Sequence, residues 1–291
     1  MVAGPLVVIV GETASGKTAL GIELARRFDG EIIAADSRTV YRGLDIGTAK
    51  PSRDEQAAAR HHLIDVVGPD ETFNAADFKR LALAAIEDIS ARGKLPIMVG
   101  GTGLYIDSVI YDYQFRPPAD KAERERLDAL SVEALQAEIT ARGLPMPANA
   151  LNRRHLTRTL ETDGAEHSKS ELRPNTLVLG LAPEREVLDQ RISDRVDVMM
   201  AAGLIEEARR LFEAYGPDVP ALETPGYSAL RQYLDGSLDL DQTKALFAQN
   251  DRYLAKRQRT WFKRNNSIHW LPQQGSAEKA VELTTTFLHT K

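Results

Sequence analysis

The sequence predicts an α/β fold in which a parallel β-sheet is covered by helices. Three observations predict this class. Short apolar runs rich in valine and isoleucine recur along the chain without alternating in polarity, which is typical of strands buried on both faces. Helical segments lie between these runs. A glycine-rich turn directly follows the first apolar run, and a helical segment follows the turn.

Six runs are predicted to form the sheet. The buried strands are PLVVIV (5–10), EIIAA (31–35), HLIDV (62–66), LPIMV (95–99) and NTLVLGL (175–181), and SIHWL (267–271) is a short closing strand. The alternation of these runs with helical stretches implies parallel pairing.

Helices are predicted between the strands and through the C-terminal third. One covers residues 18–28, and a longer one covers 74–93, with Asn74 as its N-cap and Gly93 as its stop. After Pro183 the predicted helices cover residues 184–203, 204–216 and 242–264.

Residues 117–173 interrupt this pattern. The segment is charged and helical, carries no predicted strand, and is bracketed by prolines. Ser131 caps one predicted helix that Gly143 ends, and a second helix spans residues 151–161. We therefore predict a small inserted helical subdomain. The core is then made of residues 1–116 and 174–291.

The composition limits the possible functions. The chain has 291 residues, 37 Lys and Arg against 42 Asp and Glu, a net charge of −5, and no cysteine. Disulfides, zinc–thiolate sites and thiol nucleophiles are therefore excluded. The acidic balance argues against a generally basic nucleic-acid coat but permits a local basic face. The first apolar run is too short to span a bilayer, and we expect a cytoplasmic protein.

The residues 11–18, GETASGKT, satisfy the pattern G-x-x-x-x-G-K-[ST] between a predicted strand and a helix. In this phosphate-binding loop (P-loop), backbone N–H groups and the helix N-terminus face phosphate oxygens. Lys17 adds a point charge, and the hydroxyl of Thr18 suits Mg²⁺. The sequence therefore predicts a P-loop core that binds a polyphosphate. Its binding residues are Gly11, Thr13, Ala14, Ser15, Gly16, Lys17 and Thr18.

A P-loop alone does not identify the molecule that carries the phosphates. A hydrolase needs a strand-end carboxylate that holds Mg²⁺, and acids stand at Asp36 and Asp65. The strand 95–99 instead runs into Gly100-Gly101-Thr102-Gly103, where glycines allow another molecule to approach the backbone. Ligands of open α/β sheets lie at the carboxyl ends of the strands, so we expect Asp36 and Thr102 to face the P-loop crevice. The alternative to a role of Asp36 in this crevice is that it is a strand-end turn residue or a plain Mg²⁺ ligand.

The predicted helix around residues 247–264 carries two patterns. Phe247, Leu254 and Trp261 recur every seven residues as an apolar stripe. From Arg252 to Arg264 there are six basic residues and no acid, which favours a polyanion site over a merely solvated face. The basic positions expected on one face are Arg252, Lys256, Arg259 and Lys263.

A smaller basic cluster lies in the inserted segment, at Arg153, Arg154, His155 and Arg158. Two basic helices beside a phosphate crevice indicate a nucleic-acid substrate that is presented to a small diphosphate. Arg195 is either a surface residue of its helix or a charge clamp on that diphosphate, and the residues alone do not decide between these roles.

Taken together, these stretches resemble the tRNA dimethylallyltransferase (IPP transferase) family. The matching blocks occur in family order and cover nearly the whole chain outside the inserted segment. They are GETASGKT (11–18), DSRTVYRGLDIGTAKP (36–51), HHLIDV (61–66), FNAADF (73–78), VGGTGLY (99–105), RVDVMMAAGLIEEARRL (195–211), GY (226–227) and AKRQRTWFKR (255–264).

The resemblance implies a transfer reaction and not hydrolysis. The P-loop would grip the diphosphate of dimethylallyl diphosphate, usually with Mg²⁺, while N6 of an adenosine beside the tRNA anticodon attacks the allylic carbon. Asp36 matches the general base, Thr102 matches a threonine that contacts the reacting groups, and Arg195 matches a diphosphate clamp. An aspartate suits this chemistry because the amine becomes acidic only as the C–N bond forms.

The resemblance also implies which residues contact tRNA, with the target base flipped out of its loop. They are Asp36, Ser37, Arg38, Thr39, Thr102, Arg124, Arg154, His155, Arg158, the segment 223–228 with Gly226 and Tyr227, Lys256, Arg257, Gln258, Arg259, Trp261 and Lys263. A monomer without a membrane partner is expected.

Four departures from the family pattern stand out. Thr39 replaces a common glutamine, Glu12 stands where proline is usual, Ser228 replaces a basic residue, and the inserted segment is short. Three alternatives are transfer to free adenine nucleotides, a small-molecule kinase, and a non-catalytic tRNA-binding protein. The basic helix argues against the first two. The presence of Lys17, Asp36, Thr102 and Arg195 argues against the third.

Overall fold

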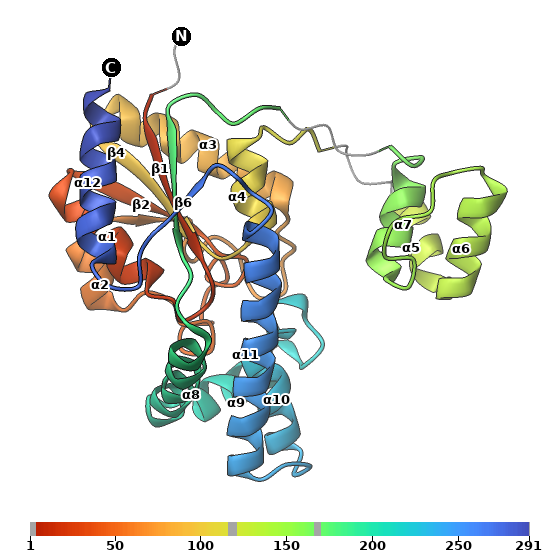
Figure 1. Cartoon of the computed structure of the whole chain (residues 1–291). Coiled ribbons are helices and arrows are strands. Elements are labelled where there is room, and N and C mark those ends of the chain that lie inside the picture. Colours follow the sequence, from red (N-terminus) through yellow and green to blue (C-terminus); the bar gives the residue numbers. More distant parts are fainter. Residues whose placement is uncertain (1–3, 116–120, 166–169, 291) are drawn as a thin grey trace. The chain divides into compact units, whose positions relative to one another are not determined.

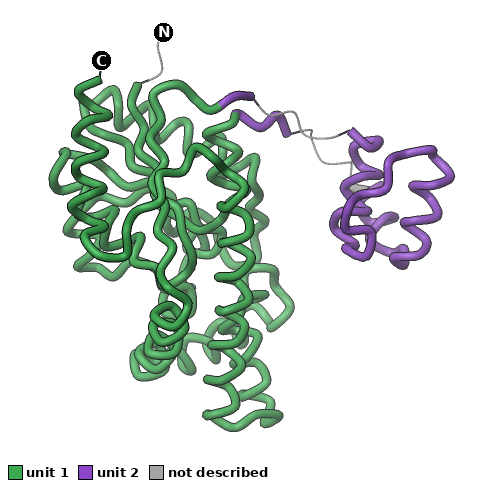
Figure 2. Tube along the Cα trace, in the orientation of Figure 1, with its two compact units in different colours: residues 1–111, 172–291 green, residues 112–171 purple. Residues whose placement is uncertain are grey.

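The computed structural model describes residues 4–115, 121–165 and 170–290. The chain divides into two compact units (Figure 2), which we call the core unit, Met1–Tyr111 with Leu172–Lys291, and the helical unit, Asp112–Glu171. The predicted boundary at Pro117 and Pro118 lies outside the described residues. Among the helices in these three ranges, none combines the length and apolar character needed to cross a membrane.

The core unit is built on a six-stranded sheet in which every pair of neighbours is parallel. The order is β3-β2-β4-β1-β5-β6. The strands are β1 (Leu6–Gly11), β2 (Gly30–Ala35), β3 (His61–His62), β4 (Leu95–Gly100), β5 (Thr176–Leu181) and β6 (Ile268–Trp270). The prediction of an α/β fold with a parallel sheet is confirmed.

The strand predicted at residues 62–66 is wrong beyond His62. Leu63 and Asp65 have φ angles of 63° and 57°, in the left-handed region that an extended strand does not use. The chain therefore leaves the sheet after two residues, and β3 is a short edge strand.

Helices cover both faces of the sheet (Figure 1). The helices α1 (Lys17–Arg27) and α12 (Ser276–His289) pack on one face, whereas α3 (Ala75–Ala91) and α4 (Gly103–Ile110) pack on the other. Asn74 caps α3 as predicted, because its side chain accepts from the N–H groups of Ala76 and Asp77. The short helix α2 (Arg53–Ala58), together with α4 and α12, was not predicted.

A group of helices follows β5. It consists of α8 (Arg185–Ala201), α9 (Leu204–Tyr215), the 3₁₀ turn η1 (Pro220–Leu222), α10 (Pro225–Leu234) and α11 (Leu240–Phe262). The seven-residue stripe predicted on α11 holds only at Phe247, which is buried, since Leu254 is half-buried and Trp261 is 37% exposed. The other buried residues of α11 are Thr243, Ala248, Asp251, Ala255 and Phe262. An acid was not expected there.

The helical unit contains α5 (Lys121–Ala129), α6 (Val132–Ala141) and α7 (Arg153–Glu161). Ser131 caps α6 as predicted, and Asn152 caps α7. The helix α5 was not predicted. The unit has a core of its own, formed by Leu127, Leu135, Ile139, Leu156 and Leu160.

Candidate active site

The P-loop lies at the carboxyl end of β1, where the chain turns into α1. Gly16 has a φ of 94° as the N-cap of α1, a conformation that glycine adopts without strain. A Cβ on Gly11 would lie 2.5 Å from the carbonyl oxygen of Leu181 on β5, so no side chain fits there. The predicted phosphate-binding residues therefore form one turn around the N-terminus of α1, which is a favourable position for an anion.

Lys17 is the centre of positive charge in this loop. Its Nζ donates a hydrogen bond to the carbonyl oxygen of Glu12. Burial lowers the pKa of Lys17 to about 8, while the charge of Asp36 opposes that shift and the charge of Arg195 adds to it. These three groups, on β1–α1, β2 and α8, are therefore close enough to act on one another electrostatically.

Arg195 on α8 reaches the P-loop. Its Nη2 donates to Thr13 Oγ1 at 2.7 Å and to Asp251 Oδ2 at 2.6 Å. Its Nε is buried and has no hydrogen-bond partner among the described residues. Burial raises the pKa of Asp251 even though the guanidinium opposes the shift. Arg195 is thus held against the loop with a donor still available.

Asp36 and Thr102 lie together, as the strand ends predicted. Their strands, β2 and β4, are neighbours, with Ala35 opposite Gly100. Asp36 Oδ1 accepts from the N–H of Arg38 at 2.8 Å, and Thr102 Oγ1 accepts from the N–H of Ser37 at 3.0 Å. A carboxylate and a hydroxyl therefore share the sheet edge that also carries the P-loop.

The glycine turn after β4 is approached closely by α11 of the same chain. A Cβ on Gly101 would lie 2.3 Å from Gln258 Nε2, and one on Gly103 would lie 2.3 Å from the indole of Trp261. Gln258 accepts from the N–H of Thr13 at 2.7 Å and donates to the Gly101 carbonyl at 3.1 Å. The helix α11 therefore joins the P-loop to the glycine turn.

Arg259 does not lie on the outward basic face on which it was expected. Its guanidinium forms a two-point ion pair with Glu12, with Nη2 to Oε2 at 2.9 Å. The same nitrogen donates to the carbonyl of Pro183 at 2.8 Å. Trp261 bonds to α4, since its Nε1 donates to Asp107 at 2.8 Å, although the residue stays 37% exposed. Lys256, Arg257 and Lys263, in contrast, are exposed.

Three of the residues expected to contact tRNA are buried. Thr39 is buried, and its hydroxyl has no partner among the described residues. Tyr227 is fully buried, and its hydroxyl donates to Glu207 Oε1 at 2.6 Å. Gly226 packs against the ring of Phe247. All three positions are therefore packed within the core unit.

Glu207, on α9, was missed by the sequence analysis. Its buried carboxylate accepts from the N–H groups of three consecutive residues, Asp45, Ile46 and Gly47, at 2.9–3.1 Å. Both the loop 45–47 and Glu207 lie inside blocks that carried the family resemblance. No feature of the sequence indicated that they touch.

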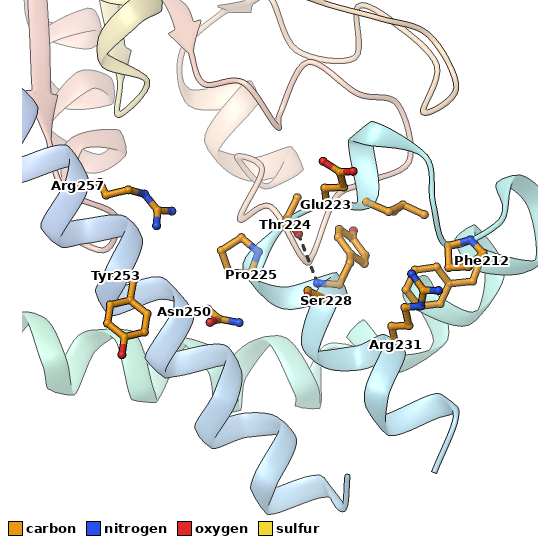
Figure 3. Close-up of a pocket in the computed structure, with 12 residues that line it drawn as sticks. Phe212, Glu223, Thr224, Pro225, Ser228, Arg231, Asn250, Tyr253 and Arg257 are labelled. Carbon is orange, nitrogen blue, oxygen red and sulfur yellow. Dashed lines mark hydrogen bonds between the residues drawn. The ribbon is translucent and has the colours of Figure 1, made fainter. Parts of the chain in front are cut away.

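A hollow of about 390 Å³ lies among α9, α10 and α11. Figure 3 shows Asn250, Tyr253 and Arg257 entering it from α11, opposite Pro225 and Ser228 of α10. The segment 223–228 and Arg257, which were predicted separately, therefore meet at one surface. Tyr253, which is 54% exposed, was not predicted. Arg38 is tied to this region because it donates to the carbonyls of Pro220 and Glu223.

The basic residues of the helical unit are partly engaged within it. Arg124 and Arg158 both pair with Glu161, whose side chain is buried. Arg153 donates to backbone carbonyls at the end of α5. Arg154 and His155 are exposed on α7, whereas Arg158 is half-buried.

Comparison with known proteins places this geometry in one family. A family model described as IPP transferase matches residues 39–265. The tRNA dimethylallyltransferase of Geobacillus thermodenitrificans is 43% identical over 97% of this chain and 95% of its own length.

Two solved structures have the same fold. That of a full-length tRNA isopentenylpyrophosphate transferase from Bacillus halodurans is 36% identical, with a TM-score of 0.76 over 98% of this chain and 96% of its own. A eukaryotic dimethylallyltransferase acting on tRNA is 25% identical, with a TM-score of 0.85 over 99% of this chain and 80% of its own. The chain belongs to the IPP transferase family.

Proposed function

We propose that this chain transfers the dimethylallyl group of dimethylallyl diphosphate to N6 of the adenosine on the 3′ side of the tRNA anticodon, and releases diphosphate. The observation that carries the proposal is the meeting of two groups of residues at one sheet edge. Lys17 and Arg195 suit a diphosphate leaving group, and Asp36 beside Thr102 suits an attacking amine. The edge is bordered by a helix with exposed basic side chains.

In the proposed reaction the N6–C bond forms while the bond between the allylic carbon and the diphosphate oxygen breaks. The amine proton passes to the carboxylate of Asp36. Backbone N–H groups of the P-loop, Lys17 and the unpaired Nε of Arg195 take the growing negative charge on the leaving group. The Thr102 hydroxyl accepts from Ser37, so its own hydrogen is free to orient the reacting groups.

Mg²⁺ fits the start of α1. Thr18 is half-buried beside Lys17, and its hydroxyl makes no hydrogen bond within the described residues. Mg²⁺ is commonly held by few protein ligands together with substrate phosphates. When bound, it would neutralise charge on the diphosphate.

RNA contacts are proposed for two surfaces. On the core unit they are Asp36, Ser37, Arg38, Thr102, the hollow at residues 223–228, Lys256, Arg257 and Lys263, to which the hollow adds Asn250 and Tyr253. On the helical unit they are Arg124, Arg154, His155 and Arg158. We assign supporting roles to Thr39, Gly226, Tyr227, Gln258, Arg259 and Trp261, which are buried in the core unit or bond within it. We further propose that the chain acts as a cytoplasmic monomer.

The test is a product analysis. The protein is incubated with unmodified tRNA, AMP and dimethylallyl diphosphate, and digested products are examined by mass spectrometry. We expect prenylated adenosine in the anticodon-loop fragment and unmodified AMP. Prenylated AMP would show that the enzyme acts on free nucleotides. The absence of product from both acceptors would refute the proposal.

A variant tests the base. Asp36→Asn is expected to reduce turnover by about 10²–10⁴-fold, because the amide cannot take the proton, while tRNA still binds. Asp29→Asn is the matched control, since Asp29 precedes the opposite end of β2 and pairs with Lys94. Unchanged turnover in Asp36→Asn would show that Asp36 is not the base.

A further inference from the structure

Glu12 places a carboxylate inside the phosphate-binding loop. Its side chain is 3% exposed, and both of its oxygens are taken by Arg259 of α11. A buried anion beside a diphosphate site repels the ligand and is itself costly unless a cation pairs with it. The guanidinium of Arg259 removes that repulsion, and the Pro183 carbonyl fixes the guanidinium in place.

The pair also fixes the backbone on which the cation of the loop depends. The carbonyl of Glu12 accepts from Lys17 Nζ, so the position of Glu12 sets where the ammonium lies. The next residue, Thr13, is held by Gln258 through its N–H and by Arg195 through its hydroxyl. Two neighbouring residues of α11, Gln258 and Arg259, therefore hold two neighbouring residues of the P-loop.

We propose that Glu12 and Arg259 are positioning residues for the diphosphate of the donor, and that Arg259 serves this site instead of the RNA. The pair acts through Lys17, by holding the loop in the conformation that receives the diphosphate. This inference rests on the proposed function for the identity of the donor. Under this proposal, α11 supports the donor site on one side and presents basic residues on the other.

The experiment compares Glu12→Gln, Arg259→Gln, the double variant, and Lys256→Gln as a matched control one turn away on the exposed face. Pyrophosphate affinity is measured by calorimetry, donor KM and kcat by turnover, and tRNA affinity as a function of salt. Pyrophosphate binding needs no catalysis, so it tests the positioning role even if the proposed reaction is wrong.

Arg259→Gln is expected to weaken pyrophosphate binding and raise donor KM by about 10–100-fold, because it removes a charge-assisted contact and leaves a buried carboxylate beside the ligand. Its tRNA affinity and salt slope stay at the wild-type values. The double variant recovers part of the loss, since both charges are then gone. Lys256→Gln keeps wild-type pyrophosphate affinity, but its salt slope for tRNA falls by about 0.7.

Two outcomes would overturn the proposal. One is a weaker tRNA affinity and a shallower salt slope in Arg259→Gln, with pyrophosphate binding unchanged, which would make Arg259 an RNA contact. The other is lower thermal stability with unchanged ligand affinities, which would make the pair only structural. If Arg259→Gln does not fold, the double variant and Glu12→Gln carry the comparison, because neither leaves an unpaired buried carboxylate.

Discussion

The two sides of α11 carry similar side chains but make different contacts. On the inward side, Gln258, Arg259 and Trp261 bond to the P-loop, the glycine turn and α4. On the outward side, Lys256, Arg257 and Lys263 are exposed to solvent. The six positions fall within eight residues of one helix. The difference teaches that the residues of one basic run can have different contacts, because the segment that each side of the helix faces decides which side chains are engaged. In the proposed function, the run is divided between two substrates.

Among the tests of this comparison, the largest expected effect comes from neutralising the basic side chains on the outward side of α11. We expect the triple variant with glutamine at Lys256, Arg257 and Lys263 to weaken tRNA binding by about 10–100-fold near physiological salt, and to flatten the salt slope by about 2, because each lost phosphate contact removes about 0.7. Pyrophosphate affinity should not change. Titrations at several salt concentrations measure both quantities, and a wild-type slope would show that this side does not meet RNA.

A variant on the inward side of α11 should affect the donor and leave tRNA binding unchanged. Gln258→Ala removes the hydrogen bonds to Thr13 and Gly101, so we expect donor kcat/KM to fall by about tenfold while tRNA affinity is retained. Gln249→Ala is the matched control, since Gln249 is exposed on the same helix. Loss of tRNA affinity in Gln258→Ala would mean that the two sides of α11 are not separate.

The smallest effect is a pH dependence. Burial lowers the pKa of Lys17 to about 8 in the protein, so the ammonium loses its proton, and its attraction for diphosphate, as the pH rises through that value. We expect donor kcat/KM to be halved near pH 8 and to keep falling above it, since kcat/KM reports the free enzyme. An arginine side chain does not titrate in this range, so kcat/KM of Lys17→Arg should not fall above pH 8. If kcat/KM of Lys17→Arg also fell above pH 8, the titrating group would be another residue.

The sequence predicted the parts of the site that follow from strand order. Asp36 and Thr102 end neighbouring parallel strands, so their proximity follows from the sheet, and the P-loop carries its own pattern. The role of Arg195 stayed open because nothing local shows which way a helical arginine points. The structure places it against Thr13.

Contacts between distant segments were not predictable. Glu12 and Arg259 are separated by 247 positions, and neither side chain reveals its partner. The left-handed backbone at Leu63 was also not predicted, since the apolar run around it is typical of a strand. On α11 the buried Asp251 broke an apolar pattern, because its partner Arg195 comes from another helix.

The carboxylate of Glu207 has a consequence for the loop at residues 45–47. Three consecutive N–H groups that point at one acceptor form the kind of concave site in which a free anion is bound. Here the acceptor is supplied by α9 and is covalently part of the chain. An anion that binds from solution would order such a loop to an extent that depends on the concentration of the anion. This loop is instead held by an acceptor that belongs to the same chain, so its shape does not depend on the concentration of a dissolved anion.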